Sequence, residues 1–471
     1  METPGLHFWM EGSDVTDEDC EEETSRDLER FSGWNILPDV ALLHIFGCLP
    51  DAARGRAARV CHRWYQIMRS PCLWRCRHFC FNGHLSKYKP PEYQTAMGYI
   101  RSLGVFLETL NVTVCPPRSQ MQARRLHKAI CTMMKELIRV RATLKSLSLT
   151  SLELDTYSWS QEHRSSLADI LIQFFIKGAS KLNFLCLYGM RNDVSQGVNV
   201  LWAMLKYQQD LSPHGSLSSL DLKDFFSTHL PVRFNCMPYV LRQLQGLTYL
   251  GLSYSCLSDE LIMELCQSHR GAGYTSGRSG SNLQTLECTL SELPKLVCSR
   301  SWATLASSCP DLEVHLSVEK VITTDSLAQI LLPEIPLRNF QMTAFYYPNE
   351  NFSIRPLLCH MLPLYGHCLQ YLALDVCNRF ELVDEELLRL VSMCKRLVDL
   401  KVRAFMDVFT VGRLLGMRLK QRSLLNKIKV KIYSQRINIT EQEDDLKKVL
   451  SFYKQQFPPE LQVLADVIPV L

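Results

Sequence analysis

The sequence predicts an α/β repeat protein, in which a short all-α unit of three helices precedes an irregular solenoid with parallel β-strands on its concave face. Two observations lead to this fold class. Helical signals are dense over residues 37–74, and a leucine hexad then recurs between residues 107 and 402. A repeat with a period of about 20–50 residues is typical of solenoids, because each unit buries its apolar face against its neighbours.

The composition agrees with a folded chain of this kind. Of 471 residues, 46% are hydrophobic and 21% are charged, which is enough apolar material for a sizeable core. The first 30 residues hold eleven acids and two bases, which leaves 50 bases against 37 acids in the remainder. This mild basic excess is not clustered, so we expect no nucleic-acid partner.

Residues 1–30 lack hydrophobic periodicity and predict a disordered acidic tail. The N-terminus is not basic, and no apolar run approaches the ~18 residues of a membrane span, so we expect neither a signal peptide nor a membrane partner. The 19 cysteines form no Cys-x-x-Cys pair. They are typical of reduced, buried side chains and predict a cytoplasmic and/or nuclear protein.

The helical unit begins at Leu37-Pro38-Asp39, because proline and an acid suit the first turn of a helix. Apolar residues follow at helical spacing until Pro50. We expect a second helical stretch over residues 54–68 and a third, short helix from Ser70-Pro71. About forty residues rarely bury enough surface to be stable alone, and the first helix is apolar around more than one stripe. The unit is therefore typical of a docking element for another chain.

The repeats follow. The pattern Leu-x-x-Leu-x-apolar, or a close variant, starts at residues 107, 144, 182, 217, 247, 283, 337, 369 and 397. An imperfect copy alternates over residues 312–318. We expect one strand and one helix per unit, with helices over residues 259–266 and 384–391. Residues 427–432 predict a closing strand whose lysines protect the sheet edge, and residues 441–456 predict a capping helix.

Two parts of the helical unit carry a family resemblance. Residues 37–49 closely resemble the first half of an F-box, and residues 57–64 with Leu73-Trp74 match its second half. Two positions depart from the F-box pattern, because Val40 replaces a common acid and residues 53–55 replace an Asp-Leu pair. The apolar and aromatic landmarks of the pattern are intact.

The repeats resemble the cysteine-containing leucine-rich repeats of many F-box proteins, with Cys309 and Cys394 placed before a strand. Together the resemblances imply four parts. These are a tail over residues 1–30, an F-box over 31–80, a linker over 81–100, and a leucine-rich-repeat-like substrate-binding domain with a C-terminal cap over 101–471.

The resemblance implies a non-catalytic substrate-recognition subunit of an SCF-type (Skp adaptor–cullin–F-box) E3 ubiquitin ligase. The F-box would bind the S-phase kinase-associated adaptor protein and, through it, a cullin–RING scaffold, while the repeats hold an unknown protein substrate. The implied adaptor-binding positions are Leu37, Pro38, Leu42, Leu43, Ile45, Phe46, Leu49, Val60, Cys61, Trp64 and Trp74. Three alternatives remain: an F-box scaffold or interaction protein that works without a cullin, a plain helical cap on the solenoid, and an enzyme with an unrecognised site.

We expect no catalytic residue, cofactor or metal. The densest metal-like cluster consists of Cys72, Cys76, His78, Cys80 and His84. Zinc needs four converging soft ligands, but this cluster crosses the third helix of the F-box, where packing is the simpler interpretation. The Cys-His neighbours at residues 359–360 and 367–368 are also more typical of packing than of nucleophilic catalysis.

The residues between the repeat leucines predict the substrate-binding face. In a strand, side chains alternate between the two faces, so the intervening positions point away from the leucine core. Aromatic residues are typical anchors of protein interfaces. Our hypothesis is that Phe184, Tyr188, Tyr249 and Tyr371 contact the substrate, and the alternative is that they pack under inserted loops.

Overall fold

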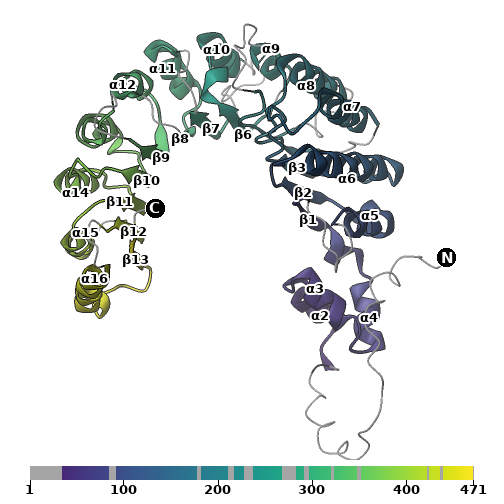
Figure 1. The fold of residues 1–471 in the computed structure, drawn as a ribbon, viewed down its shortest axis with the longest axis horizontal. Coiled ribbons are helices and arrows are strands. Elements are labelled where there is room, and N and C mark those ends of the chain that lie inside the picture. Colours follow the sequence, from purple (N-terminus) through teal and green to yellow (C-terminus); the bar gives the residue numbers. More distant parts are fainter. Residues whose placement is uncertain are drawn as a thin grey trace, which may run out of the picture. The chain divides into compact units, whose positions relative to one another are not determined.

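The computed structural model describes most of the chain. The described residues are 34, 36–83, 92–177, 182–209, 217–227, 237–244, 246–267, 283–290, 296–319, 323–346, 352–421, 424–434 and 439–469. The predicted acidic tail lies outside them. The chain divides into two compact units. The first comprises Met1–Cys186 and Met190–Gly215, and the second comprises Leu187–Gly189 and Ser216–Leu471 (Figure 1).

The first unit begins with a small helical group. Its elements are the helices α2 (Asp39–Gly47), α3 (Asp51–Ala57) and α4 (His62–Met68), and the 3₁₀ helix η2 (Pro71–Trp74). The single helical stretch expected over residues 54–68 is therefore wrong, because it forms two helices. Cys61 has extended backbone angles and its Sγ atom accepts a hydrogen bond from the Trp64 amide, so it caps a new helix instead of continuing the old one.

Strands and helices alternate through the rest of the first unit. The elements are β1 (Cys76–Phe81), α5 (Glu92–Leu103), η3 (Gly104–Phe106), β2 (Thr109–Val114), α6 (Gln120–Arg139), β3 (Ser146–Thr150), α7 (Gln161–Lys177), β4 (Phe184–Cys186) and α8 (Val194–Gln209). Neighbouring strands from β1 to β4 pair in parallel in chain order. The sequence reasoning missed β1, which overlaps the end of the span expected for the F-box.

The second unit continues the same alternation with nine strands among the described residues. The elements are β5 (Ser219–Leu222), α9 (Met237–Gln243), β6 (Tyr249–Ser253), η5 (Tyr254–Cys256), α10 (Asp259–Gln267), β7 (Thr285–Leu290), α11 (Ser299–Ser308), β8 (Glu313–Val318), α12 (Thr324–Ile330), β9 (Leu337–Phe345), α13 (Ile354–Pro356), η6 (Leu357–Met361), η7 (Leu362–Tyr365), β10 (Tyr371–Cys377), α14 (Asp384–Met393), β11 (Asp399–Ala404), α15 (Val408–Gln421), β12 (Lys427–Tyr433), α16 (Ile439–Lys454) and β13 (Gln462–Ile468).

The hexad leucines form the core of both units. Leu147, Leu220, Leu250 and Leu372, for example, are at most 1% exposed. The residues between them are mostly half-buried, as the alternating burial of β3 and β10 shows. In the second unit the helices lie on one side of the strands, which leaves the other face of the sheet uncovered (Figure 1). The predicted fold class, an N-terminal helical group followed by parallel strands alternating with helices, is confirmed.

The predicted end of the repeats is wrong. β12 forms where a closing strand was expected, and α16 forms where the capping helix was expected, but a further strand follows. β13 pairs in parallel with β12, from Lys427 opposite Gln462 to Tyr433 opposite Ile468. The three lysines of β12 therefore do not guard an open sheet edge but stand on the face of a strand with neighbours on both sides.

Candidate docking surfaces

The F-box core accounts for two of the eleven adaptor-binding positions. Leu42 and Phe46 of α2 are 0% and 1% exposed and pack with residues of α3, α4 and η2. A periodicity argument cannot separate such residues from docking residues, because α2 is apolar around most of its circumference. Leu42 and Phe46 can only influence a partner by holding the helices in place.

The other predicted positions lie at or near the surface. Leu37, Leu43, Ile45, Leu49, Trp64 and Trp74 are half-buried against that core. Pro38, Val60 and Cys61 are exposed. The exposed fraction of Val60 is 63%, although a branched apolar side chain would ordinarily be buried.

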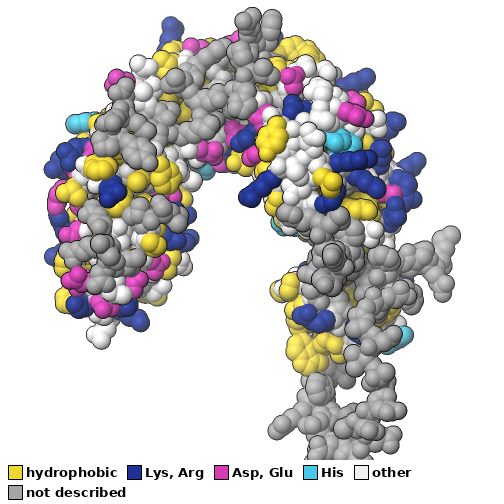
Figure 2. All heavy atoms as spheres, in the orientation of Figure 1, with side chains coloured by type: hydrophobic (Ala, Val, Ile, Leu, Met, Phe, Trp, Pro, Cys, Tyr) yellow, Lys and Arg dark blue, Asp and Glu magenta, His cyan; other side chains and the backbone are white. Residues whose placement is uncertain are grey.

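Sequence reasoning missed three apolar residues around the start of α2. Trp34, Ile36 and Val40 are all exposed, Ile36 by 78% and Val40 by 65%, and the Trp34 ring packs edge-on against Trp64. Figure 2 shows hydrophobic side chains on the visible face of the α2–α3 region. Their apolar type next to Leu37-Pro38 was the signal that could have identified them.

Arginine side chains tie the helical group together. Arg54 Nε donates to the Phe46 carbonyl at 2.9 Å and Nη2 donates to the Gly47 carbonyl at 2.8 Å, while Nη1 donates to the Leu73 carbonyl. The carbonyls at the end of a helix lack intrahelical donors, so Arg54 satisfies the C-terminus of α2. Arg54 is one of the residues that depart from the F-box pattern, and it performs a packing role here.

Two further side chains fix the aromatic landmarks. Arg63 binds Asp39 at 2.7 Å and so joins α4 to the start of α2. Trp74 Nε1 donates to the Met68 carbonyl at 2.7 Å, and the Trp74 carbonyl accepts from the Tyr99 hydroxyl at 2.9 Å. These contacts fix Trp74 and the start of α2 within the helical group.

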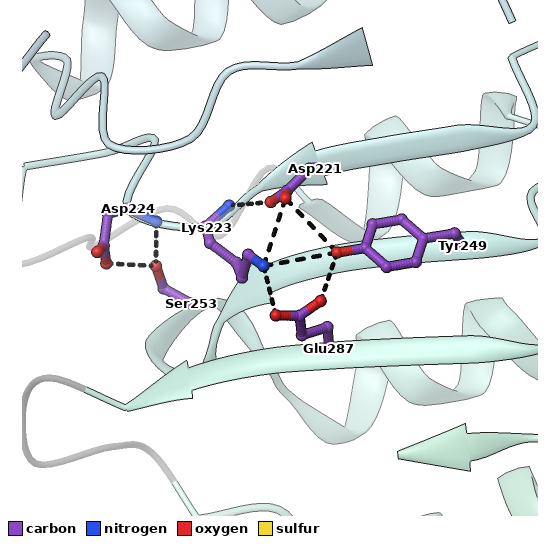
Figure 3. Close-up of polar contacts among 6 residues, drawn as sticks. All are labelled: Asp221, Lys223, Asp224, Tyr249, Ser253 and Glu287. Atoms are coloured by element: carbon purple, nitrogen blue, oxygen red, sulfur yellow. Dashed lines mark hydrogen bonds and ion pairs between the residues drawn. The ribbon is translucent and has the colours of Figure 1, made fainter. Parts of the chain in front are cut away.

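A polar network occupies the uncovered strand face of the second unit (Figure 3). Lys223 Nζ lies 2.6 Å from Glu287 Oε1 and 3.3 Å from Asp221 Oδ2. The Tyr249 hydroxyl donates to Glu287 Oε2 at 2.6 Å. Lys223 also lies over the Tyr188 ring, 5.7 Å from its centroid. Tyr188 and Tyr249, both predicted to contact substrate, are thus brought together by one lysine.

The electrostatics of this network favour the paired state. Burial works against the charged form of Lys223, but Asp221 and Glu287 together raise the pKa of its ammonium group. Burial also disfavours charge on Glu287, yet the hydrogen bonds from Lys223 and Tyr249 lower the pKa of this carboxyl overall. For Asp221 burial dominates and raises the pKa. The Lys223–Glu287 pair is therefore the ionised centre of the network.

Gly251 gives the network its space. It lies between Asp221 and Glu287 in the register of β5, β6 and β7. A Cβ atom at this position would approach Asp221 Oδ1 to 2.6 Å and the Tyr249 hydroxyl to 3.2 Å. The absence of a side chain lets the charges of β5 and β7 meet across β6.

Two hollows lie farther along the same face. The larger one, the groove, has a volume of about 400 Å³ and is lined by residues of β9 to β13. The smaller hollow, of about 160 Å³, is lined by residues of β7 to β10. Tyr371 and Gln341 line both. The Tyr371 hydroxyl accepts a hydrogen bond from Lys401 Nζ at 2.9 Å, and the ammonium lies over the ring.

Phe184 belongs to the first unit, whereas the other three aromatic residues belong to the second. It is half-buried on β4 of the first unit, opposite Ser146 of β3. The prediction of the substrate-binding face also did not include Glu313, His315 and Asn339. These residues belong to the same face, but a register shift between β8 and β9 interrupts the regular alignment.

Comparisons with known proteins agree with this architecture. A protein-family model described as F-box-like matches residues 34–80. F-box/LRR-repeat protein 21 of Mus musculus is 24% identical over 415 residues, which cover 84% of this chain and 84% of the relative. Over most of its length this chain is therefore similar to F-box/LRR-repeat proteins.

The relationship to individual relatives is distant. F-box/LRR-repeat protein 21 of Ovis aries is 24% identical over 379 residues, 78% of this chain and 76% of the relative. F-box/LRR-repeat protein 12 of Mus musculus is 51% identical, but only over 39 residues, 8% of this chain.

The cysteines and histidine of the metal-like cluster have other neighbours. The Cys72 and Ser70 side chains are in hydrogen-bond contact, His78 Nε2 lies 3.1 Å from Thr113 Oγ1, and Cys80 lies 3.7 Å from Asn82 Oδ1. His84 is outside the described residues. Across the part of the chain that the structure describes, no group of three or more His, Cys, Asp or Glu side chains could hold a metal ion.

One of the Cys-His neighbours has a clear packing role. Cys368 is buried, and its thiol donates to the Leu337 and Tyr365 carbonyls. Burial raises the pKa of this thiol, which disfavours the nucleophilic thiolate.

Among the helices that the structure describes, none is long and apolar enough to cross a membrane.

Proposed function

We propose that this F-box/LRR-repeat protein is a substrate receptor of an SCF-type ubiquitin ligase. Its F-box binds the S-phase kinase-associated adaptor protein and thereby a cullin–RING scaffold, and its strand face holds the protein to be ubiquitylated. The chain works by proximity, because tethering a substrate near the transfer machinery raises its effective concentration without any catalytic side chain. We expect this to take place in the cytoplasm and/or nucleus.

The exposed apolar side chains around the F-box core carry this proposal. Ile36, Val40 and Val60 are each more than 60% exposed beside half-buried Leu43 and Trp64. Surplus apolar surface on a small helical unit marks a site that another protein covers. Of the eleven positions implied by the F-box pattern, the proposed contacts are Leu37, Pro38, Leu43, Ile45, Leu49, Val60, Cys61, Trp64 and Trp74, with Leu42 and Phe46 as their support.

Finer assignments belong to the same proposal. The proposed substrate contacts on the strand face are Phe184, Tyr188, Tyr249 and Tyr371. Tyr188 and Tyr249 belong to the Lys223 network and would contact substrate together with it. The division at residues 30, 80 and 100 is proposed in the same way. The resemblance of the chain from about residue 34 to F-box only protein 39, or to a near relative of it, is a further proposal.

Co-purification tests the docking assignment. We expect Val60→Glu to remove the adaptor and the cullin from the purified complex, because a charge in an apolar interface loses burial and stays unpaired. Met121→Glu is the matched control, since Met121 of α6 is also apolar and 64% exposed. Retention of the adaptor by Val60→Glu would refute the docking surface.

The same experiment separates the receptor from the scaffold alternative. Adaptor and cullin together on the unsubstituted chain support the receptor. Adaptor without cullin, under conditions in which a known receptor retains both, would support the cullin-independent scaffold instead. Charge at Phe46 is a poorer test than charge at Val60, because Phe46 is buried and its substitution would unfold the helices.

A further inference from the structure

The strand face of the second unit carries two kinds of cation. At one end Lys223 is neutralised by Asp221 and Glu287. At the other end Lys429 is exposed and Lys431 is half-buried, and neither makes an ion pair within the described residues. Because these two lysines lie on a sheet face and not at a sheet edge, neither an ion pair nor edge protection explains their presence.

Strand register gathers further positive charge beside these two lysines. Lys401 of β11 lies opposite Lys429, and Arg403 lies opposite Lys431. Lys401 bonds to the neutral Tyr371 hydroxyl and makes no close ion pair within the described residues, although Asp399 acts on its charge from a distance. Arg403 is paired with Asp375 at 3.1 Å. Four cations and one carboxylate therefore line the 400 Å³ groove.

Apolar surface accompanies the charge. Leu464 of β13 lies opposite Lys429, lines the groove and is 49% exposed. The Tyr371 ring lines the groove on its other side. A ligand that fits must bring both negative charge and an apolar side chain. An extended peptide does so readily, because its successive side chains alternate in direction.

This mixture favours a peptide over a nucleic acid. Binding to a phosphate backbone needs a continuous track of cations. Here Asp375 stands inside the groove and Leu464 interrupts its cationic lining. The neighbouring hollow is lined by Glu287.

We propose that this groove, lined by Lys401, Arg403, Lys429 and Lys431 with Leu464 and Tyr371, binds an extended acidic segment of the partner protein that carries an apolar residue. The proposal rests on the proposed receptor function and names the class of substrate sequence that the repeats would capture. Carboxylates of the segment pair with Lys429 and Lys431, and its apolar side chain packs on Leu464.

The test uses the full chain purified with its adaptor and two fluorescent peptides. One alternates glutamate and leucine, and the other alternates lysine and leucine. We expect the acidic peptide to bind and the basic peptide not to bind. The double variant Lys429→Glu with Lys431→Glu should weaken binding of the acidic peptide by roughly tenfold or more, because charge reversal replaces attraction by repulsion.

Lys427→Glu is the matched control. Lys427 is exposed on the same strand but does not line the groove, so binding should stay within about twofold of the unsubstituted chain. Unchanged binding of the acidic peptide by the double variant would overturn the proposal, as would equal binding of the basic peptide. Stronger competition by oligothymidylate than by the unlabelled acidic peptide would overturn it in favour of a nucleic acid.

Two further outcomes separate the possible causes of failure. Deletion of residues 1–30 should leave the affinity unchanged, whereas a several-fold gain would overturn the proposal by identifying the acidic N-terminal segment as the occupant. Adaptor binding is measured on the same samples. If the acidic peptide fails while adaptor and cullin are retained, the groove proposal fails alone. If the adaptor is absent from the unsubstituted complex, the receptor function fails.

Discussion

The F-box and the strand face of the second unit use charged and apolar residues in opposite ways. In the F-box, arginines point at the backbone: Arg54 donates to three carbonyls, and apolar side chains such as Val60 remain outside. On the strand face the repeat leucines are turned inward, and Lys223 points at Asp221, two residues before it, and at Glu287 of β7, two strands away. In the F-box, the charged side chain stabilises residues that are close to it in the sequence. On the strand face, it links strands that are far apart in the sequence.

The difference teaches how each region can recognise a partner. A helical group whose polar groups are satisfied internally presents apolar surface, which binds by burial. A sheet face whose outward positions are polar binds by complementarity of charge and hydrogen bonds, which gives specificity. The proposed adaptor and the proposed substrate would call for these two kinds of surface.

The largest expected effect comes from breaking the strand-face network. Lys223→Ala should lower the free energy of unfolding by about 3 kcal/mol, since it strands Glu287 and Asp221 without their cation. This value is at the low end for buried pairs because the Glu287 side chain is 30% exposed. Hydrogen–deuterium exchange should show faster exchange in β5, β6 and β7.

Lys429→Ala is the control for this prediction. Lys429 lies on the same face but makes no ion pair among the described residues, so its loss should change stability by less than about 0.5 kcal/mol. Equal exchange of β5–β7 in both variants would mean that the network adds no stability, and the contrast with the F-box would then disappear.

The next effect concerns the arginine of the F-box. Arg54→Ala should destabilise the helical group by about 2 kcal/mol, because three carbonyls lose a charged donor and two of them end α2. Arg56→Ala, on the exposed side of α3, is the control. Exchange of the α2 amides should increase only for Arg54→Ala. Increased exchange in both variants would point to a general need for charge on α3.

The sequence predicts the two regions unequally for a physical reason. The F-box signals are local, since helix spacing, Pro38 and Trp64 lie within one short segment. The strand leucines are equally legible, because each hexad buries its own residues. Yet Lys223 and Glu287 are 64 positions apart, and only the register of three strands brings them together. No local pattern contains that register.

Two strands escaped prediction for related reasons. β1 has no leucine hexad and follows directly on the F-box, and β13 also lacks the hexad. Missing β13 changed the interpretation of Lys429 and Lys431, which became groove residues once β12 was no longer an edge. The sequence pattern also could not predict that Phe46 is buried and Val60 exposed, because both are apolar residues in apolar helical stretches.

The smallest expected effect separates the two regions by pH. Burial lowers the pKa of His315, which lines the smaller hollow, even though Glu287 and Glu313 act to raise it. A histidine with a lowered pKa binds fewer protons when folded than when unfolded, so stability rises with pH and falls as pH drops below about 6.5. His44 and His62 of the F-box are exposed. Acidification to about pH 5.5 should therefore lower the protection of the β7, β8 and β9 amides against hydrogen exchange, once the slower intrinsic exchange at acid pH is divided out. The protection of α2 and α4 should stay unchanged.

His315→Gln tests the source of this sensitivity. The variant cannot take up the proton, so the protection of the β7–β9 amides, relative to their intrinsic exchange, should become nearly independent of pH between about 7 and 5.5. Lys223 also faces His315 and stays charged throughout this range, so it supplies a constant repulsion that protonation of His315 must overcome. Acid sensitivity that persists in His315→Gln would shift its origin to the carboxylates around Lys223. The strand face would then respond to pH through the Lys223 network rather than through His315.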